Sequence, residues 1–312
     1  MKDLLKTSDL SRGDLKYLLS RAQKFKARPH QRRSVLAGES VCLYFAKPST
    51  RTRISFDVAV TRLGGSAIAL GPNDLQLGRG ETIEDTARVI SRFARAFVIR
   101  TFKDDDVERF ARAASIPVVN ALTDGHHPCQ SLADLLTLHE HKGALDKLKV
   151  TYLGDGNNVA VSLMQACALI GAEFSLGAPK GYQISEALVE EARSLAKKGE
   201  AKITVTEDPA EALRGADAVY ADVWLSMGDS DSEKAARHAA LGPYTVDQRA
   251  MSLAKPDALF MHCLPAHRGE EVSAEVCDGP QSVIFDQAEN RLHTSVAVLY
   301  ALLEGKLEGR AS

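Results

Sequence analysis

Short apolar runs alternate with longer amphipathic segments along most of this 312-residue chain. In the first half, the apolar runs predict four β-strands, at residues 40–46, 66–70, 95–100 and 116–122. In the second half they predict five more, at residues 149–155, 173–179, 202–208, 217–224 and 257–265. Strand–helix alternation of this kind is typical of an α/β chain with parallel sheets. We therefore expect two doubly wound parallel-sheet domains joined by long helices.

The segments between these runs have apolar residues three and four positions apart, which predicts helices. The helix-start signals include Thr82 followed by Asp85, and the acidic residues 104–106 before an apolar run. The segments with this spacing are residues 82–94, 105–114, 158–172 and 185–199. The helices are thus expected to cover the predicted sheets.

Residues 54–60, with the sequence ISFDVAV, carry an ambiguous pattern, because their apolar positions alternate as in a strand. A strand has just ended at Ala46, however, and Pro48 breaks the chain after it. The Gly64–Gly65 pair is a good stop for a helix. We therefore predict a helix here, with its amino-terminal end near Thr52.

The domain junction is expected near residues 141–149, where a long helix beginning at Pro128 ends in Gly143. The next predicted strand starts a new unit. We expect one domain at residues 1–145 and a second at residues 146–289. The last segment, residues 290–312, is predicted to be a helix that packs back on the first domain.

Composition narrows the class of protein. Apolar residues make up 45% and charged residues 26% of the chain, and the net charge is −2, so no global field selects nucleic acid or an anionic membrane. No apolar stretch approaches the ~20 residues that a membrane span needs, and the amino-terminal segment does not read as a signal peptide. The five cysteines are scattered, without a CxxC pair. These features predict a reduced, cytoplasmic protein.

Unusual residues follow three predicted strands of the first half, where ligands bind in parallel sheets. The sequence STRTR at 49–53 follows the first of these strands, Arg100 ends another, and HHPCQ at 126–130 follows the last. Hydroxyls and guanidinium groups beside a helix amino terminus can ring a phosphate. Each feature alone is equally compatible with a solvated turn, a salt bridge or a helix cap. Together they predict an anion site.

The second half offers a different set of polar residues after its strands. Asn158, Asp222 and Ser226 would suit the ammonium and carboxylate groups of an amino acid. Cys263 is either catalytic or simply a buried thiol. The GDGNN sequence at 154–158 lacks the GxGxxG spacing, and the chain has no GxxxxGK[ST] sequence, so neither dinucleotide binding nor a P-loop is predicted.

Four motifs in this order and spacing resemble the carbamoyltransferases, and among them the ornithine carbamoyltransferases. They are STRTR (49–53), HPCQ (127–130), DVWLSMG (222–228) and HCLP (262–265). The resemblance implies transfer of a carbamoyl group from carbamoyl phosphate to the δ-amine of L-ornithine, which gives L-citrulline and phosphate. It also implies a carbamoyl-phosphate domain followed by an ornithine domain, in a homotrimer with active sites at subunit boundaries. No cofactor and no metal is expected, and neither nucleic acid nor a membrane is an expected partner.

The resemblance also implies a role for each matching residue. The phosphate would be held by Ser49, Thr50, Arg51, Thr52 and Arg100. His127, Gln130 and Arg291 would contact the carbamoyl group. Cys263 and the Leu264 carbonyl would face the δ-amine and the carbamoyl NH₂ group, and Gln76 would bind carbamoyl phosphate by reaching into a neighbouring subunit's site. Ornithine would be bound by Asn158, Asp222, Ser226 and Met227. Among these, the residues expected to be catalytic are Arg51, His127, Cys263 and Arg291.

Several points stay open from the sequence. HCLP and Arg79 differ from the corresponding segments of aspartate carbamoyltransferases. A carbamoyltransferase for putrescine, acetylornithine or aspartate remains an alternative, as does a non-catalytic amino-acid or anion-binding protein of the same fold. Residues 225–238 are interpreted as a loop that closes over ornithine. His267 and Arg268 receive no role, and biosynthetic and degradative forms share these motifs.

Overall fold

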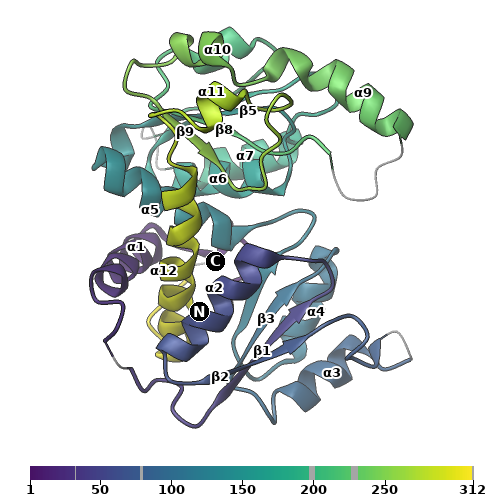
Figure 1. The fold of residues 1–312 in the computed structure, drawn as a ribbon. Coiled ribbons are helices and arrows are strands. Elements are labelled where there is room, and N and C mark those ends of the chain that lie inside the picture. Colours follow the sequence, from purple (N-terminus) through teal and green to yellow (C-terminus); the bar gives the residue numbers. More distant parts are fainter. Residues whose placement is uncertain (32, 78–79, 197–200, 226–230, 311–312) are drawn as a thin grey trace. The chain divides into compact units, whose positions relative to one another are not determined.

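The computed structural model describes residues 1–31, 33–77, 80–196, 201–225 and 231–310. The chain forms two compact units (Figure 1). Unit 1 comprises Met1–Leu136 and Glu289–Ser312, and unit 2 comprises Thr137–Ala288. Their limits fall within two helices, α5 (Pro128–Lys142) and α12 (Ile284–Leu303). The boundary expected between residues 145 and 146 stays a prediction.

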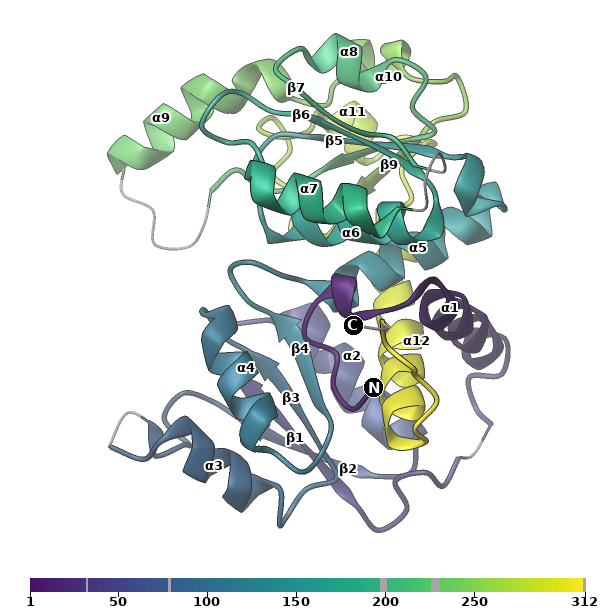
Figure 2. The same ribbon diagram turned by 180° about the vertical axis from the view of Figure 1, so that it is seen from behind.

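Unit 1 contains a four-stranded parallel sheet in the order β2-β1-β3-β4. The strands are β1 (Ser40–Phe45), β2 (Ser66–Leu70), β3 (Ala96–Arg100) and β4 (Val118–Leu122). Helices α3 (Ile83–Ile90) and α4 (Asp104–Ala113) pack on one face of this sheet, around the stacked rings of Phe97 and Phe110. Helices α2 (Thr50–Arg62) and α12 lie on the opposite face (Figures 1 and 2). Both faces are thus covered, which explains the nearly continuous apolar strands.

Helix α2 confirms the prediction for residues 54–60, although it begins two residues before Thr52. Its buried side chains follow the helical spacing, and the apolar alternation is incidental because Ile54 is 57% exposed. The helix stops as expected at Gly64, which has φ 91°. A Cβ at this glycine would lie 2.6 Å from the carbonyl oxygen of Arg33, so both the backbone angle and the space require glycine.

Unit 2 contains a five-stranded parallel sheet in the order β7-β6-β5-β8-β9. Its strands are β5 (Lys149–Leu153), β6 (Glu173–Gly177), β7 (Ile203–Thr206), β8 (Ala218–Ala221) and β9 (Leu259–His262). Its further helices are α6 (Asn158–Ile170), α7 (Glu186–Leu195), α8 (Pro209–Leu213), α9 (Asp231–Leu241), α10 (Gln248–Leu253) and α11 (Ala274–Cys277). The two parallel sheets with their helices confirm the predicted fold class.

Within the described residues, the remaining helical elements are one long helix and short 3-10 turns. They are α1 (Arg12–Ala27), η1 (Thr7–Asp9), η3 (Leu145–Lys147) and η4 (Gly242–Tyr244). Helix α1 carries a capping box, in which Ser11 and Asp14 satisfy each other's backbone N–H groups. Among the described residues, no helix combines the length and the apolar character that crossing a membrane requires.

Four sequence predictions need correction. The strands predicted over 217–224 and 257–265 are shorter, because Asp222 and Cys263 already lie in the turns that follow β8 and β9. Residues 231–238 of the predicted loop belong to α9, where alanine-rich sequence favours a helix, while residues 226–230 lie outside the described residues. The helix predicted over 290–312 starts earlier, at Ile284, and ends at Leu303, shortly before Gly305 at φ 60°.

Candidate active site

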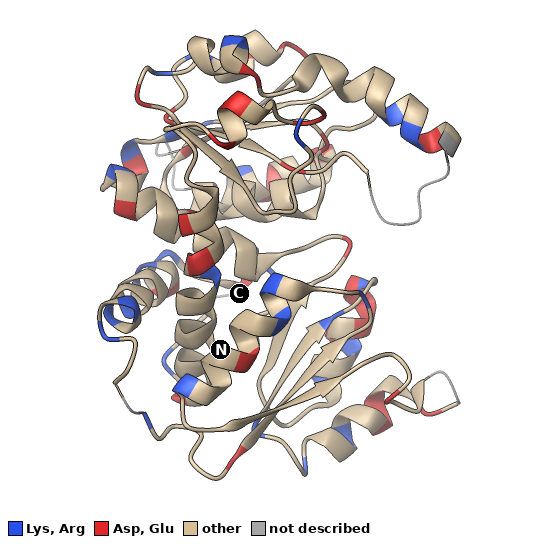
Figure 3. Ribbon diagram, in the orientation of Figure 1, with Lys and Arg blue, Asp and Glu red and all other residues tan. Residues whose placement is uncertain are grey.

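Three strand ends of unit 1 bring a cluster of positive charge together. Arg51 lies in the first turn of α2 after β1, Arg100 ends β3, and His127 directly precedes α5 after β4. His127 is buried, and its pKa is held well below the ordinary value, first by burial and then by the charges of Arg291, Arg100 and Arg51. Basic residues are visible at the amino-terminal end of α2 (Figure 3). A chain with little net charge therefore has a strongly positive local site.

The amino terminus of α2 adds backbone donors to this cluster. Ser49 is the N-cap residue, but its side chain accepts no hydrogen bond from the helix. The N–H groups of the first turn are therefore not capped by the residue that usually caps them. Together with the positive end of the helix dipole, they favour an anion at this point.

A chain of buried polar side chains continues from α2 to α5 within unit 1. The guanidinium of Arg291 donates to Gln130 Oε1 at 2.5 Å and to Thr52 Oγ1 at 3.0 Å. Gln130 Nε2 in turn donates to Asp134 Oδ1 at 2.8 Å. All four side chains are at least 97% buried. Hydrogen bonds in such surroundings fix the guanidinium in advance, as an anion site requires.

Asp134 was not identified from the sequence, although a signal for it exists. Gln130 and Asp134 are four residues apart on α5, so they share one face of the helix. A buried carboxylate at this spacing from a predicted site residue indicates a positioning partner. Its oxygen orients the Gln130 amide, so that the amide oxygen faces Arg291.

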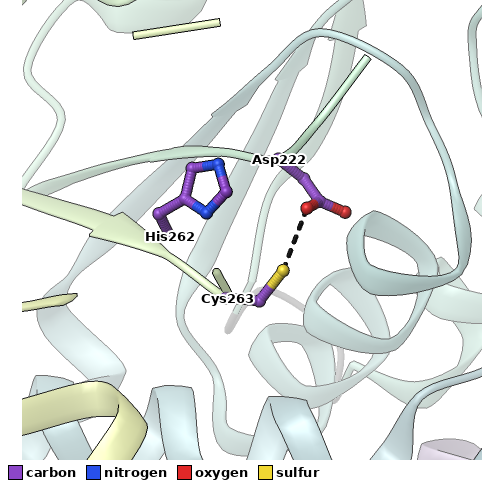
Figure 4. A group of neighbouring side chains, drawn as sticks. All are labelled: Asp222, His262 and Cys263. Carbon is purple, nitrogen blue, oxygen red and sulfur yellow. Dashed lines mark hydrogen bonds between the residues drawn. The ribbon is translucent and has the colours of Figure 1, made fainter. Parts of the chain in front are cut away.

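The cysteines separate into two groups. Four are buried, and the pKa of Cys129 is raised to about 12 by burial, which leaves its thiol protonated. Cys263 is only partly buried. Its Sγ donates to Asp222 Oδ1 at 2.9 Å (Figure 4). Of the two interpretations of Cys263, this placement favours a thiol that takes part in a site.

Asp222 is fixed from several directions in unit 2. Its Oδ1 accepts from the backbone N–H of Val223 at 2.8 Å as well as from Cys263. Its Oδ2 accepts from Asn157 Nδ2 at 2.8 Å. Asp222 is 8% exposed, so the carboxylate is held by these contacts at the edge of the solvent. It can receive a cationic group such as an ammonium.

Asn157 was not among the predicted site residues, and the role of its neighbour Asn158 stays a prediction. Asn157 is the N-cap of α6, and its Oδ1 accepts from the N–H groups of Val159 and Ala160 at 2.9 and 3.2 Å. Asn158 is the first residue of the helix and is half-buried. An asparagine just before a long apolar run is an N-cap signal that identifies the first of the two.

The turn after β9 is held by a buried pair of His262 and Glu271. His262 Nδ1 accepts from the N–H of Leu264 at 2.9 Å, so its Nε2–H donates to Glu271 Oε1 at 3.2 Å. Burial acts to raise the pKa of Glu271, but hydrogen bonds from His262 and the His267 N–H outweigh it and leave the pKa lowered. Leu264 has φ 60° and precedes a cis peptide bond to Pro265. This network fixes the backbone beside Cys263.

The remaining predicted residues either lie nearer the surface than the buried cluster of unit 1 or fall outside the described residues. Thr50 is exposed, and Ser49 is half-buried. Gln76 is exposed, and among the described residues its side chain makes no hydrogen bond with the arginine cluster of unit 1. Ser226 and Met227 lie outside the described residues. Unit 1 thus gathers Arg51, Thr52, Arg100, His127, Gln130 and Arg291, and unit 2 gathers Asp222 and Cys263.

Two family models together match most of the chain. Residues 2–140 match the family model described as "Aspartate/ornithine carbamoyltransferase, carbamoyl-P binding domain", and residues 146–302 match that of the Asp/Orn binding domain. A protein of Bacillus subtilis named ornithine carbamoyltransferase is 50% identical over 97% of this chain and 94% of its own length.

Solved structures give the same result. The ornithine carbamoyltransferase of Pyrococcus furiosus has a TM-score of 0.93 and 45% identity, and covers 98% of both chains. The anabolic ornithine carbamoyltransferase of Campylobacter jejuni has a TM-score of 0.91 and 39% identity, and covers 98% of this chain and 100% of its own. The chain therefore belongs to the aspartate/ornithine carbamoyltransferase family.

Proposed function

We propose that this chain transfers the carbamoyl group of carbamoyl phosphate to the δ-amine of L-ornithine, releasing L-citrulline and phosphate. The observation that carries the proposal is the convergence of Arg51, Arg100 and Arg291 on a buried His127. This cluster matches the negative charge of an acyl phosphate, and the chain belongs to a family whose models are described by carbamoyl-phosphate and Asp/Orn binding.

In unit 1, the phosphate is proposed to lie at the start of α2. Ser49, Thr50, Arg51 and Thr52 would contact it through hydroxyl, guanidinium and backbone N–H groups, with Arg100 supplying further charge. His127, Gln130 and Arg291 would contact the carbamoyl group. Because His127 is kept neutral, it acts as a hydrogen-bond donor to the carbamoyl oxygen and not as a charged group.

In unit 2, ornithine is proposed to bind beside Asp222. The carboxylate would pair with the α-ammonium group, and Asn158 would contact the α-carboxylate. Ser226 and Met227 complete the proposed set. Cys263 and the carbonyl of Leu264 would face the δ-amine and the carbamoyl NH₂ group, since the turn that carries them is fixed by His262 and Glu271.

The proposed reaction is a substitution at the carbamoyl carbon. The neutral δ-amine forms a C–N bond, the C–O bond to phosphate breaks, and the phosphate takes up the amine proton. A free alkyl ammonium has a pKa of about 10, so the site must favour the minor neutral form. Negative charge builds on the carbamoyl oxygen and then on the phosphate, where Thr52, His127 and the arginines stabilise it. Positioning and electrostatics supply the catalysis.

We further propose a homotrimer in which Gln76 reaches into the site of a neighbouring subunit. Several large apolar side chains of unit 1 support an association of subunits, since they are exposed in the single chain. They are Ile54, Ile68, Val89 and Phe93. A cytoplasmic enzyme of arginine biosynthesis, catalysing the reaction that also serves the urea cycle, fits the free cysteines and the anabolic relative of Campylobacter jejuni.

The test is a substrate panel with purified chain. Carbamoyl phosphate is supplied with ornithine, putrescine, acetylornithine or aspartate, and each carbamoylated product is measured by mass spectrometry. We expect kcat/KM for ornithine to exceed that for every other amine by at least ~100-fold, because only ornithine can occupy both the carboxylate and the ammonium contacts and still present a second amine to the carbamoyl carbon. A higher kcat/KM for another amine, or no product from any of them, would refute the proposal.

A further inference from the structure

Two histidines and two glutamates gather in unit 2 at positions to which the proposed reaction gives no substrate contact. They are His238 of α9 and His267, Glu270 and Glu271 of the segment after β9. One ligand atom each of His267, Glu270 and Glu271 lies within 4.8 Å of the others. His238 Nε2 lies 3.7 Å from Glu270 Oε2. We call these four residues the His/Glu cluster.

Two carboxylate oxygens of the His/Glu cluster lack a hydrogen bond. Glu270 Oε2 and Glu271 Oε2 are buried atoms, and neither accepts a hydrogen bond from any residue that the structure describes. The side chain of Glu271 is fully buried, although its other oxygen binds His262 and the His267 N–H. His267 Nδ1 lies 3.8 Å from Glu270 Oε2 and 4.0 Å from Glu271 Oε2, beyond hydrogen-bond distance. A buried carboxylate oxygen without a donor is costly unless a cation satisfies it.

We propose that the His/Glu cluster binds a divalent transition metal ion, with Zn²⁺ as the best match. Imidazole nitrogens and carboxylate oxygens are ordinary Zn²⁺ ligands at about 2.0–2.2 Å, which places tetrahedral ligand atoms about 3.4 Å apart. The observed separations of 3.8 and 4.0 Å need only a small contraction. His267, Glu270 Oε2 and Glu271 Oε2 are three ligands. His238 Nε2 lies 3.7 Å from Glu270 Oε2 but outside the group whose ligand atoms are all within 4.8 Å of one another, so it becomes the fourth ligand only when its side chain moves closer.

The proposed ion has a structural role and takes no part in carbamoyl transfer, because it links two segments of unit 2. His238 belongs to α9, whereas the other three ligands belong to the segment after β9. Glu271 would bind the ion through Oε2 while its Oε1 accepts the hydrogen bond from His262. His262 in turn accepts from the backbone N–H of Leu264 and so fixes that residue. Metal binding therefore ties α9 to the turn that carries Cys263, and it stabilises unit 2 by mass action.

The test uses the tag-free full chain with Cys263→Ser, because Asp222, His262 and Cys263 form another group of potential ligands. Zn²⁺ binding is measured by titration calorimetry, and Co²⁺ is used for absorption spectroscopy. We expect one Zn²⁺ per chain, an affinity at least ~10-fold lower in His267→Ala and in Glu270→Gln, and visible Co²⁺ bands of a four-coordinate site. The control is His141→Ala, which removes an imidazole that pairs with Asp286 at 2.9 Å elsewhere in unit 2.

These measurements follow metal binding and not carbamoyl transfer. They therefore test the Zn²⁺ site even if the chain fails to carbamoylate ornithine. Absence of Zn²⁺ binding by the Cys263→Ser chain would overturn the site. So would an equal loss of affinity in His141→Ala, or unchanged affinity in both cluster variants. Glu270→Gln removes a charge without removing volume, so a folding defect in His267→Ala alone does not obscure the outcome.

Discussion

Two arginines stand two positions apart on α2, and their surroundings differ. Arg51 is half-buried and close enough to His127 to lower its pKa, whereas Arg53 is exposed. A helix turns by about 200° over two residues, so the side chains leave it in nearly opposite directions. Of the two arginines in this short motif, Arg51 therefore belongs to the candidate site and Arg53 to the surface.

We expect Arg51→Ala to lower kcat/KM for carbamoyl phosphate by at least ~1,000-fold, because it removes charge from the phosphate and from the transition state. Arg53→Ala is the matched control and should change kcat/KM less than about threefold. Steady-state kinetics with saturating ornithine measures both. Near-wild-type turnover by Arg51→Ala would remove the phosphate site from α2.

His127 makes the stability of the chain depend on pH. Its folded pKa lies well below 6.5, so below that pH the unfolded chain binds a proton that the folded chain excludes. Stability from this group is fully present above pH 6.5 and is lost as the pH falls toward the folded pKa. The loss is at most about 1.4 kcal/mol per pH unit for one proton.

We expect the midpoint of urea unfolding of the wild-type chain to fall between pH 7 and pH 5 more steeply than that of His127→Asn. The asparagine keeps a polar side chain at the position but does not titrate. The comparison cancels the contributions of other groups, since both chains share them. Parallel curves for the two chains would show that His127 is not held neutral by its surroundings.

At the level of elements, the start of α6 is joined to the carboxylate after β8. Asn157 uses its oxygen to cap the helix and its nitrogen to hold Asp222. Asparagine and aspartate are about equally good as N-caps, so an exchange of one for the other separates these two uses. The cap survives the exchange, but the donor to Asp222 becomes a like charge.

We expect Asn157→Asp to raise KM for ornithine by ~10-fold or more while the KM for carbamoyl phosphate stays nearly unchanged. The melting temperature should fall, because two carboxylates would then lie at hydrogen-bond distance. The Cys263 thiol should also react more slowly with iodoacetamide at a given pH, because added negative charge near Asp222 disfavours the thiolate. The control is Asp247→Asn, which makes the reverse exchange at the N-cap of α10. Similar kinetic changes in both variants would assign Asn157 a capping role alone.

The sequence was a good guide to elements and a weaker one to contacts. The order of strands and helices followed from apolar spacing, and the helical state of residues 54–60 followed from Pro48 and Gly64. The strands before Asp222 and Cys263 end earlier than predicted. The pattern of apolar residues does not show at which residue the chain leaves the sheet. Asn157 escaped because its partner Asp222 lies 65 residues away in the chain and an asparagine also follows it. Asp134 and Glu271 escaped although their partners Gln130 and His262 are only four and nine residues away, because apolar spacing does not show which polar side chains are buried.

At the level of the whole molecule, the proposed assembly makes Gln76 and Arg51 parts of the same site from different subunits. We expect Gln76→Ala and Arg51→Ala each to be nearly inactive alone. When the two are mixed, dissociated and reassembled, about a quarter of the sites should be free of both substitutions and active. Citrulline formation before and after reassembly measures this, with sedimentation to give the subunit number.

Recovery of activity requires that the two residues come from different chains. If Gln76 acted within its own chain, every reassembled site would contain one defect and no activity would return. A chain that sediments as a monomer would remove the assembly altogether, and the exposed Phe93 and Ile54 would then need another explanation.

The uncapped start of α2 has a consequence for engineering. Ser49 offers the helix no side-chain hydrogen bond, so an aspartate there should stabilise the chain by about 1 kcal/mol, by capping the helix and by matching its dipole. The same carboxylate would occupy and repel the place of the proposed phosphate. A screen for thermal stability alone would therefore select Ser49→Asp and yield a more stable protein that has lost its catalytic activity. The stability missing at this turn is what the substrate supplies when it binds.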